Sequence, residues 1–136
     1  MKLRKNFKQL QVLKISVTLM EKLEFSTNWN NKLDCKCFTT IRIYNLSKHF
    51  RGNQFEVFCK RKFKTKAIVL GTIITKLDQL SDYVCYLDTG YNKEETTAIL
   101  KKMYPHIDFK QQKICIVLLE RIEPLKPLQV TLFNYL

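Results

Sequence analysis

A threonine and an arginine two positions apart, Thr40 and Arg42, have the side chains and the spacing best suited to chemistry in this chain. They lie in a strand-like segment, residues 37–45, in which Ile41 and Ile43 have the opposite parity. Successive side chains of a strand point to opposite faces, so the isoleucines are expected to enter a core while Thr40 and Arg42 stand together on the other face. A hydroxyl beside a fork of donors can hold a phosphate, a sugar or a base. The alternative is an ordinary half-exposed strand.

Four aromatic side chains are candidates to complete a ligand site around the threonine–arginine pair: Phe38, Tyr44, Trp29 and Tyr91. Phe38 and Tyr44 share the parity of that pair, so their rings are expected to flank it. Trp29 and Tyr91 are expected to wall the cleft as stacking platforms, although each fits a core equally well.

A basic stretch follows the strand-like run at residues 54–61. Its cations are interleaved with phenylalanines, and the lysines we expect to contact a ligand are Lys60, Lys62 and Lys64. Phosphate contacts combined with base stacking would explain such a mixture. The alternative is a solvated hairpin whose phenylalanines belong to the core.

The formal net charge is +12 over 136 residues, which is the size of one typical domain. Residues 1–19 supply five of the cations and no acid, yet the remainder still holds 19 basic residues against 12 acidic ones. Such a domain attracts polyanions such as RNA or DNA, or an anionic membrane surface.

The five cysteines are odd in number and fit no zinc-finger spacing, so we expect no metal site and no cofactor. A reduced, cytoplasmic compartment fits this cysteine usage best. No apolar run approaches the roughly 20 residues that span a bilayer. We expect no membrane partner and favour a monomer.

From Met20 onward the chain is rich in strands, so we expect the folded domain to span residues 20–136 and residues 1–19 to be a basic extension. The expected strands cover residues 23–25, 37–45, 54–61, 67–75, 114–119 and 128–136, with a basic connection at 63–66. We expect a short helix over residues 77–84 and a second helix from an N-cap at Asn92 to about Met103. This order predicts a β-rich α+β domain built as a small barrel.

The order of motifs resembles the ASCH family, a branch of the PUA-like fold associated with RNA. Phe38–Arg42 is similar to the family's Lys-Thr-x-Thr-x-Arg strand, and Phe50–Val57 to its entry into the second hairpin. Asp88–Tyr91 is similar to its acid-Gly-aromatic segment, and Leu100–Pro105 to its closing helix. The resemblance covers roughly residues 21–121. It implies a small PUA-like β-barrel flanked by two or three helices, with a cleft beside the threonine–arginine strand.

The resemblance also implies a set of catalytic residues, because one bacterial branch removes the acetyl group from N-acetylcytidine with a Lys, a Thr and a Glu. The threonine falls on Thr40 and the family arginine on Arg42. Cys37 occupies the place of the lysine, with Lys36 one residue away, and the nearest acid to the place of the glutamate is Asp88. Lys36, Thr40 and Asp88 are therefore the catalytic candidates, provided that they converge in the fold.

Three functions follow as expectations. The first is an RNA- or nucleotide-binding domain that uses the cleft around Thr40 and Arg42. The second is an enzyme, either an amidohydrolase acting on N-acetylcytidine or a ribonuclease. The third is a protein-interaction module in which the basic hairpin meets an acidic partner.

Overall fold

The structure, a computed structural model, describes residues 20–122. Within that range the chain forms five strands, two α-helices and two short 3-10 helices, which confirms the α+β class. In chain order they are β1 (Glu21–Phe25), η1 (Trp29–Asp34), β2 (Cys37–Ile43), β3 (Gln54–Cys59), β4 (Lys62–Thr75), η2 (Leu77–Gln79), α2 (Asp82–Thr89), α3 (Lys93–Met103) and β5 (Ile114–Arg121). The extension at residues 1–19 and the strand expected at 128–136 lie outside the described residues.

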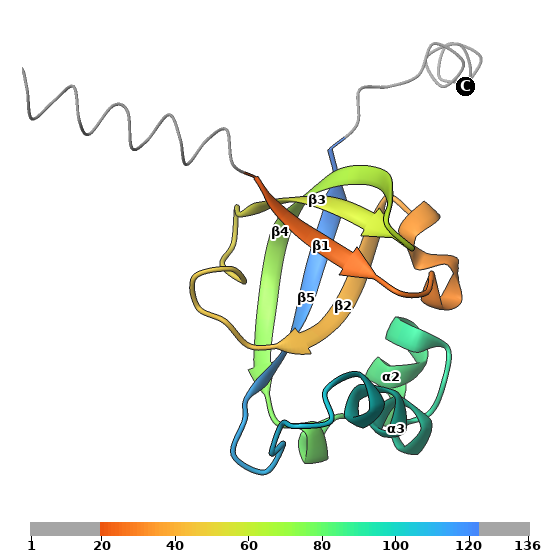
Figure 1. Ribbon diagram of the computed structural model, residues 1–136, viewed down its shortest axis with the longest axis vertical. Helices are drawn as coiled ribbons and strands as arrows, with labels where there is room; N and C mark the ends of the chain where they lie inside the picture. Colours follow the sequence, from red (N-terminus) through yellow and green to blue (C-terminus); the bar gives the residue numbers. More distant parts are fainter. Residues whose placement is uncertain (1–19, 123–136) are drawn as a thin grey trace, which may run out of the picture.

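The strands form a single curled sheet in the order β1-β3-β4-β5-β2, in which β1 pairs parallel to β3 and every other neighbour is antiparallel (Figure 1). β1 and β2 are therefore the two edges of the sheet. The curl brings these edges face to face across an open side, where a side chain of β2 bonds to the main chain of β1. The barrel-like sheet expected from the sequence is thus present, with a seam between β1 and β2 in place of a closing strand pair.

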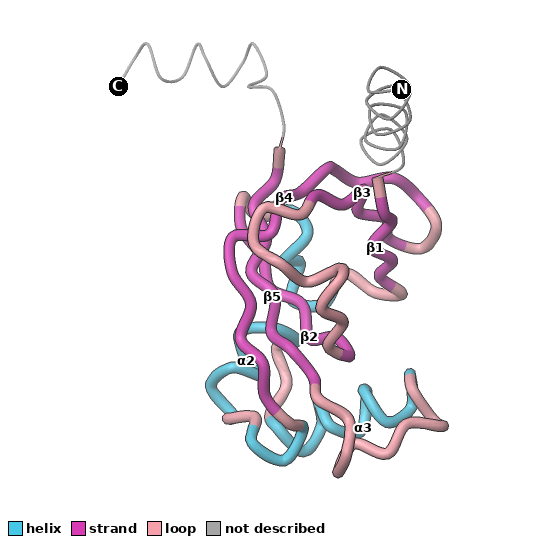
Figure 2. Tube along the Cα trace, turned by 90° about the vertical axis from the view of Figure 1, so that its left-hand side faces the viewer, coloured by secondary structure: helices cyan, strands magenta, loops and turns pink. Residues whose placement is uncertain are grey.

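The core consists of two clusters on opposite faces of the sheet. The first lies inside the curl and includes Leu23, Phe25, Leu33, Phe38, Val57, Val69 and Leu119. The second joins the outer face of β2 and β5 to the helices and includes Ile41, Leu77, Leu80, Cys85, Leu100 and Ile114. Figure 2 shows α2 and α3 gathered at one end of the sheet, where they cover this outer face. Both faces of β2 are consequently buried.

Short polar side chains cap the first turns of the two α-helices. Asn92 caps α3 as expected, because its side chain accepts a hydrogen bond of 2.8 Å from the amide of Glu95. The single helix expected over residues 77–84 is wrong: Leu80 is extended, and Ser81 caps a new helix by accepting from the amide of Val84. No helix among residues 20–122 is long and apolar enough to cross a membrane.

Strand β4 begins earlier than the sequence suggested. The basic segment 63–66, expected to be a connection, is part of β4 and pairs with β3 through Val57 opposite Thr65 and Glu56 opposite Lys66. Alternation explains the difference, because Thr65 is buried in the curl while Lys66 points to solvent. The lysines of this segment therefore lie on a paired hairpin.

Candidate functional site

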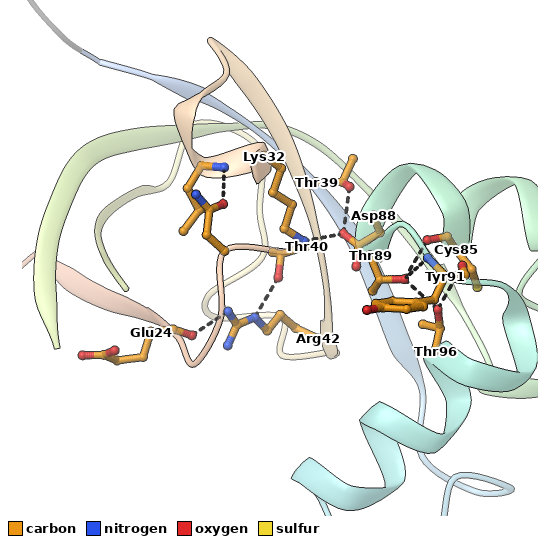
Figure 3. Close-up of polar contacts among 12 residues, drawn as sticks. Glu24, Lys32, Thr39, Thr40, Arg42, Cys85, Asp88, Thr89, Tyr91 and Thr96 are labelled. Atoms are coloured by element: carbon orange, nitrogen blue, oxygen red, sulfur yellow. Dashed lines mark hydrogen bonds and ion pairs between the residues drawn. The ribbon is translucent and has the colours of Figure 1, made fainter. Parts of the chain in front are cut away.

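Arg42 spans the seam between the two edge strands. Its Nη2 donates a hydrogen bond of 2.7 Å to the main-chain oxygen of Glu24 in β1, and its Nε donates one of 2.9 Å to Oγ1 of Thr40 (Figure 3). The guanidinium also lies 4.6 Å from the centre of the Phe25 ring, a cation–π contact. Burial lowers the pKa of Arg42, while Tyr104 and Asp88 oppose that shift. The arginine is thus held by β1, β2 and the first core cluster together.

A buried ion pair joins η1 to α2 close to this arginine. Lys32 Nζ lies 2.9 Å from Asp88 Oδ1, and the two side chains are only 7% and 5% exposed. Thr39 also donates to Asp88 Oδ1, over 2.8 Å (Figure 3). Burial lowers the pKa of the Lys32 ammonium, and the Asp88 carboxylate opposes that shift. Asp88 therefore binds a cation and a hydroxyl at once, which holds α2 against β2 and η1.

The asparagines before Lys32 explain how a lysine comes to be buried. Asn30 and Asn31 have φ of 57° and 52°, in the left-handed region that asparagine tolerates better than most residues. Asn28 accepts a hydrogen bond of 2.9 Å from the amide of Leu33. These turns lead Leu33 into the core and Lys32 toward Asp88.

Two hollows meet at Arg42, and both are lined by Glu24 and Arg42. The smaller one, here called the inner chamber, has a volume of about 30 Å³ and is lined by residues that include Trp29, Lys32, Thr40, Asp88, Thr96 and Met103. The larger one, here called the outer groove, has a volume of about 420 Å³ and is lined by residues that include Lys22, Tyr44, Lys48, His49 and Tyr104. The inner chamber has room for little more than water, whereas the outer groove is within the size range of small-molecule sites.

Among the described residues, the outer groove is lined by three basic ones, Lys22, Arg42 and Lys48, and by one acidic one, Glu24. The Lys22 ammonium lies over the Phe58 ring, and that of Lys48 is 3.9 Å from a carboxylate oxygen of Glu21. His49 lies at the wall of the groove and is buried; its Nδ1 accepts a hydrogen bond of 3.1 Å from the amide of Asn45. Burial lowers the pKa of His49, and the positive charges of Arg42 and Lys48 lower it further. A neutral imidazole next to excess positive charge leaves a groove suited to an anion.

The catalytic candidates from the sequence do not all converge. Thr40 lines the inner chamber and so does Asp88. Lys36 does not, because its side chain is 82% exposed and pairs with Glu120 at 3.6 Å. The lysine in the chamber is Lys32, which was not among the candidates from the sequence.

The aromatic candidates divide in the same way. Phe38 is 3% exposed and packs edge-on against Phe25 inside the curl, so the expectation that its ring flanks a ligand is wrong. Tyr44 lines the outer groove. Trp29 lines the inner chamber and packs edge-on against Tyr91, which is 42% exposed, with ring centres 5.9 Å apart.

The basic hairpin stands apart from both hollows. Lys60 and Lys62 are exposed, and Lys64 pairs with Asp34 at 3.3 Å. None of the three lines the inner chamber or the outer groove.

Several residues of the outer groove were not singled out from the sequence. Lys48 and His49 come from the β2–β3 connection and Tyr104 from the end of α3, far apart in the chain. Local patterns carry no signal for them, because only the curl of the sheet brings them to Arg42.

Comparison of this chain with protein-family models, with curated proteins and with solved structures finds no match.

Proposed function

We propose that this chain is an ASCH-type, PUA-like domain that binds a nucleotide, free or within RNA, in the outer groove beside Arg42. The resemblance of its motifs supports the family assignment, and the curled sheet with helices beside the threonine–arginine strand is the arrangement that the resemblance implies. The site itself is argued from the groove.

The observation that carries the proposal is the combination of cations and phenol rings in one groove of sufficient size. Lys22, Arg42 and Lys48 supply charge for a phosphate, and Tyr44 and Tyr104 supply rings against which a base or sugar can pack. A volume of about 420 Å³ accommodates a mononucleotide-sized ligand. Among the described residues Glu24 is the one acid that lines the groove, and the ion pair that Lys48 forms with Glu21 is long, at 3.9 Å.

The test is titration with a nucleoside 5′-monophosphate and with the matching nucleoside, followed by calorimetry and by chemical-shift changes. Lys48→Ala removes a groove cation that lies outside the core, since Lys48 is exposed and its ion pair with Glu21 is long, at 3.9 Å. We expect this variant to bind the monophosphate about tenfold more weakly, the equivalent of about 1.4 kcal/mol. Lys102→Ala, an exposed lysine on α3, is the matched control.

Wild type and Lys48→Ala are both expected to lose affinity for the monophosphate as salt rises, with the smaller loss in the variant. Equal affinity of the two proteins for the monophosphate would reject the groove as its site.

A second candidate, amide hydrolysis, is favoured by the inner chamber. There the Thr40 hydroxyl is held by Arg42, and Lys32, an amine whose pKa is lowered, lines the same space. In such a reaction Lys32 acts as the neutral amine that remains after its ammonium has released a proton. It takes the threonine proton as Thr40 Oγ1 bonds to the acetyl carbon of N-acetylcytidine, and it passes this proton to the leaving nitrogen as the C–N bond breaks. Water then hydrolyses the ester and frees acetate. Because the chamber has room only for water-sized groups, Arg42 must move to admit the acetyl group.

The test of this candidate is release of cytidine from N-acetylcytidine, measured with protein in excess. We expect no cytidine from Thr40→Val, which keeps the side-chain volume but has no hydroxyl, nor from Lys32→Met. If wild type forms no cytidine, or if Thr40→Val forms as much as wild type, this candidate is rejected.

A further inference from the structure

The β3–β4 hairpin turns through two residues whose side chains do not suit the turn. Lys60 and Arg61 lie between the paired residues Cys59 and Lys62, and their φ values are 50° and 66°. A two-residue hairpin turn with positive φ at both positions favours Asn-Gly or Gly-Gly, because a Cβ is strained there. The chain thus places two long cations where the backbone alone would favour small residues.

The tip of this hairpin carries positive charge that no acidic residue of the described part of the chain neutralises. Among residues 20–122, Lys60, Arg61 and Lys62 form no ion pair and all three are exposed. Lys64, farther along the strand, is the one of these hairpin cations that is paired, with Asp34. Three consecutive cations at the tip of the hairpin, without an ion pair to any described residue, make a site for a polyanion.

An exposed aromatic ring stands directly beside these cations. Phe63 is 55% exposed, and its ring meets that of Phe58 edge-on with centres 5.7 Å apart. The outward side of Phe63 is therefore an open apolar surface surrounded by charge. Neither an acidic peptide nor the backbone of a duplex requires such a ring, whereas an unpaired base stacks on it.

The tip is connected to the outer groove by a continuous line of contacts. Lys22, which lines the groove, places its Nζ 5.1 Å from the centre of the Phe58 ring, and Phe58 in turn contacts Phe63. The amide of Lys60 also donates a hydrogen bond of 2.9 Å to the main-chain oxygen of Phe25, next to Glu24 at the seam. A chain of nucleotides that has one unit in the groove can therefore extend past Lys22 to the tip.

We propose that the tip of the β3–β4 hairpin, formed by Lys60, Arg61, Lys62 and Phe63, is a second contact surface for a single-stranded nucleic acid. The cations contact phosphates and the Phe63 ring stacks on a base. This inference deepens the proposed function and rests on it for the nature of the ligand in the groove. The ligand of the whole surface is then a strand of several nucleotides, of which the groove holds one.

The test compares two variants that each remove two positive charges. Lys60→Asn/Arg61→Gly installs the residues that the turn favours, and Lys101→Ala/Lys102→Ala removes two exposed lysines from α3. Binding of labelled single strands of about 12 nucleotides, in RNA and in DNA form, is followed by fluorescence anisotropy at two salt concentrations. We expect the turn variant to melt at a higher temperature than wild type and yet to bind either strand about tenfold more weakly. The helix variant should keep affinity within about threefold.

A third variant, Phe63→Thr, separates stacking from charge. It keeps a residue that favours strands but removes the ring, so single strands should bind it several-fold more weakly while duplexes of the same length bind wild type and variant alike. Equal losses of affinity in the turn and helix variants would overturn the proposal in favour of unspecific charge. Binding of a poly-glutamate peptide or of anionic lipid vesicles, without binding of oligonucleotides, would overturn it in favour of another partner.

Failure of the groove is distinguishable from failure of the tip. If the groove alone is wrong, a mononucleotide does not bind, yet the oligonucleotide still binds more weakly to the turn variant than to wild type. If the tip alone is wrong, Lys48→Ala weakens mononucleotide binding while the turn variant binds oligonucleotides as wild type does.

Discussion

Arg42 and Glu24 are joined by a hydrogen bond of 2.7 Å that runs from the guanidinium of one edge strand to the main-chain oxygen of the other. Since β1 and β2 are the ends of the strand order, this bond ties the sheet into a nearly closed barrel. The same arginine donates to Thr40 and stacks on Phe25, so one side chain contacts both edge strands at the seam. Arg42 is thereby a structural residue as well as a ligand candidate.

Arg42→Ala is accordingly expected to destabilise the domain. The Glu24 oxygen and the buried Thr40 hydroxyl both lose a charged donor, which costs about 2 kcal/mol or more. The measurement is the free energy of unfolding in urea, with Arg51→Ala in the exposed turn before β3 as the matched control. Unchanged stability of Arg42→Ala would show that the seam bonds contribute nothing, and any loss of ligand affinity in this variant would then report contact with the ligand directly.

The Lys32–Asp88 pair should behave as a buried ion pair whose members are costly to separate. Lys32→Met leaves the Asp88 carboxylate in the interior with the Thr39 hydroxyl as its one hydrogen-bond partner among the described residues and Arg42 as the nearby positive charge, so we expect a loss of about 3–5 kcal/mol. The double variant Lys32→Met/Asp88→Asn carries no charge at either position of this pair and should be more stable than Lys32→Met alone. Urea denaturation of wild type, both single variants and the double variant forms the cycle that measures the coupling.

A double variant as unstable as the sum of the two single variants would contradict this account. It would mean that Lys32 and Asp88 contribute independently to the free energy of unfolding, although their charged atoms lie 2.9 Å apart.

The sequence was a good guide where a local rule decides the structure. The cap at Asn92 depends on side chains only a few residues apart. The strand at residues 114–119 was recognised by its unbroken apolar run, and β5 does lie between two neighbours. Each of these features depends on residues that are close together in the sequence.

The site was harder to predict because it depends on closure of the sheet. The alternation of residues 37–45 correctly predicted that Ile41 and Thr40 lie on opposite faces of the strand. It also led us to expect that the face of Thr40 is open to solvent. In the curled sheet that face is the barrel interior, so Phe38 is core and only the seam exposes Arg42. Lys32 was missed for the same reason: its partner Asp88 is 56 positions away, and nothing local marks a lysine that will be buried.

His49 should make the domain less stable in mild acid. Its Nδ1 accepts from the amide of Asn45, so the ring must be neutral, and burial with Arg42 and Lys48 nearby lowers its pKa below 6.5. Below that value the unfolded chain binds more protons than the folded one, and stability is lost as the pH falls from about 6.5 through the lowered pKa. His49→Asn, whose Oδ1 accepts without titrating, should flatten this dependence in urea denaturation at several pH values. An equal slope in wild type and variant would assign the acid sensitivity to the carboxylates instead.

Cys115 should have the opposite pH dependence, on the alkaline side. Its thiol is fully buried, with Sγ 3.4 Å from Nδ1 of His49, and burial raises its pKa from 9.0 to about 11. Between these values the folded chain holds a proton that the unfolded chain has lost, so the stabilisation is complete below pH 9 and disappears as the pH rises through about 11. The stability advantage of wild type over Cys115→Ala should therefore shrink by about 2 kcal/mol across this range.

Lys32 and the tyrosines are common to wild type and Cys115→Ala, so the difference between the unfolding free energies of these two proteins isolates the thiol. Cys35→Ala, at an exposed thiol, is the matched control. A constant difference between wild type and Cys115→Ala up to pH 11 would show that the thiolate is accommodated in the fold, with Arg42 as its counter-ion.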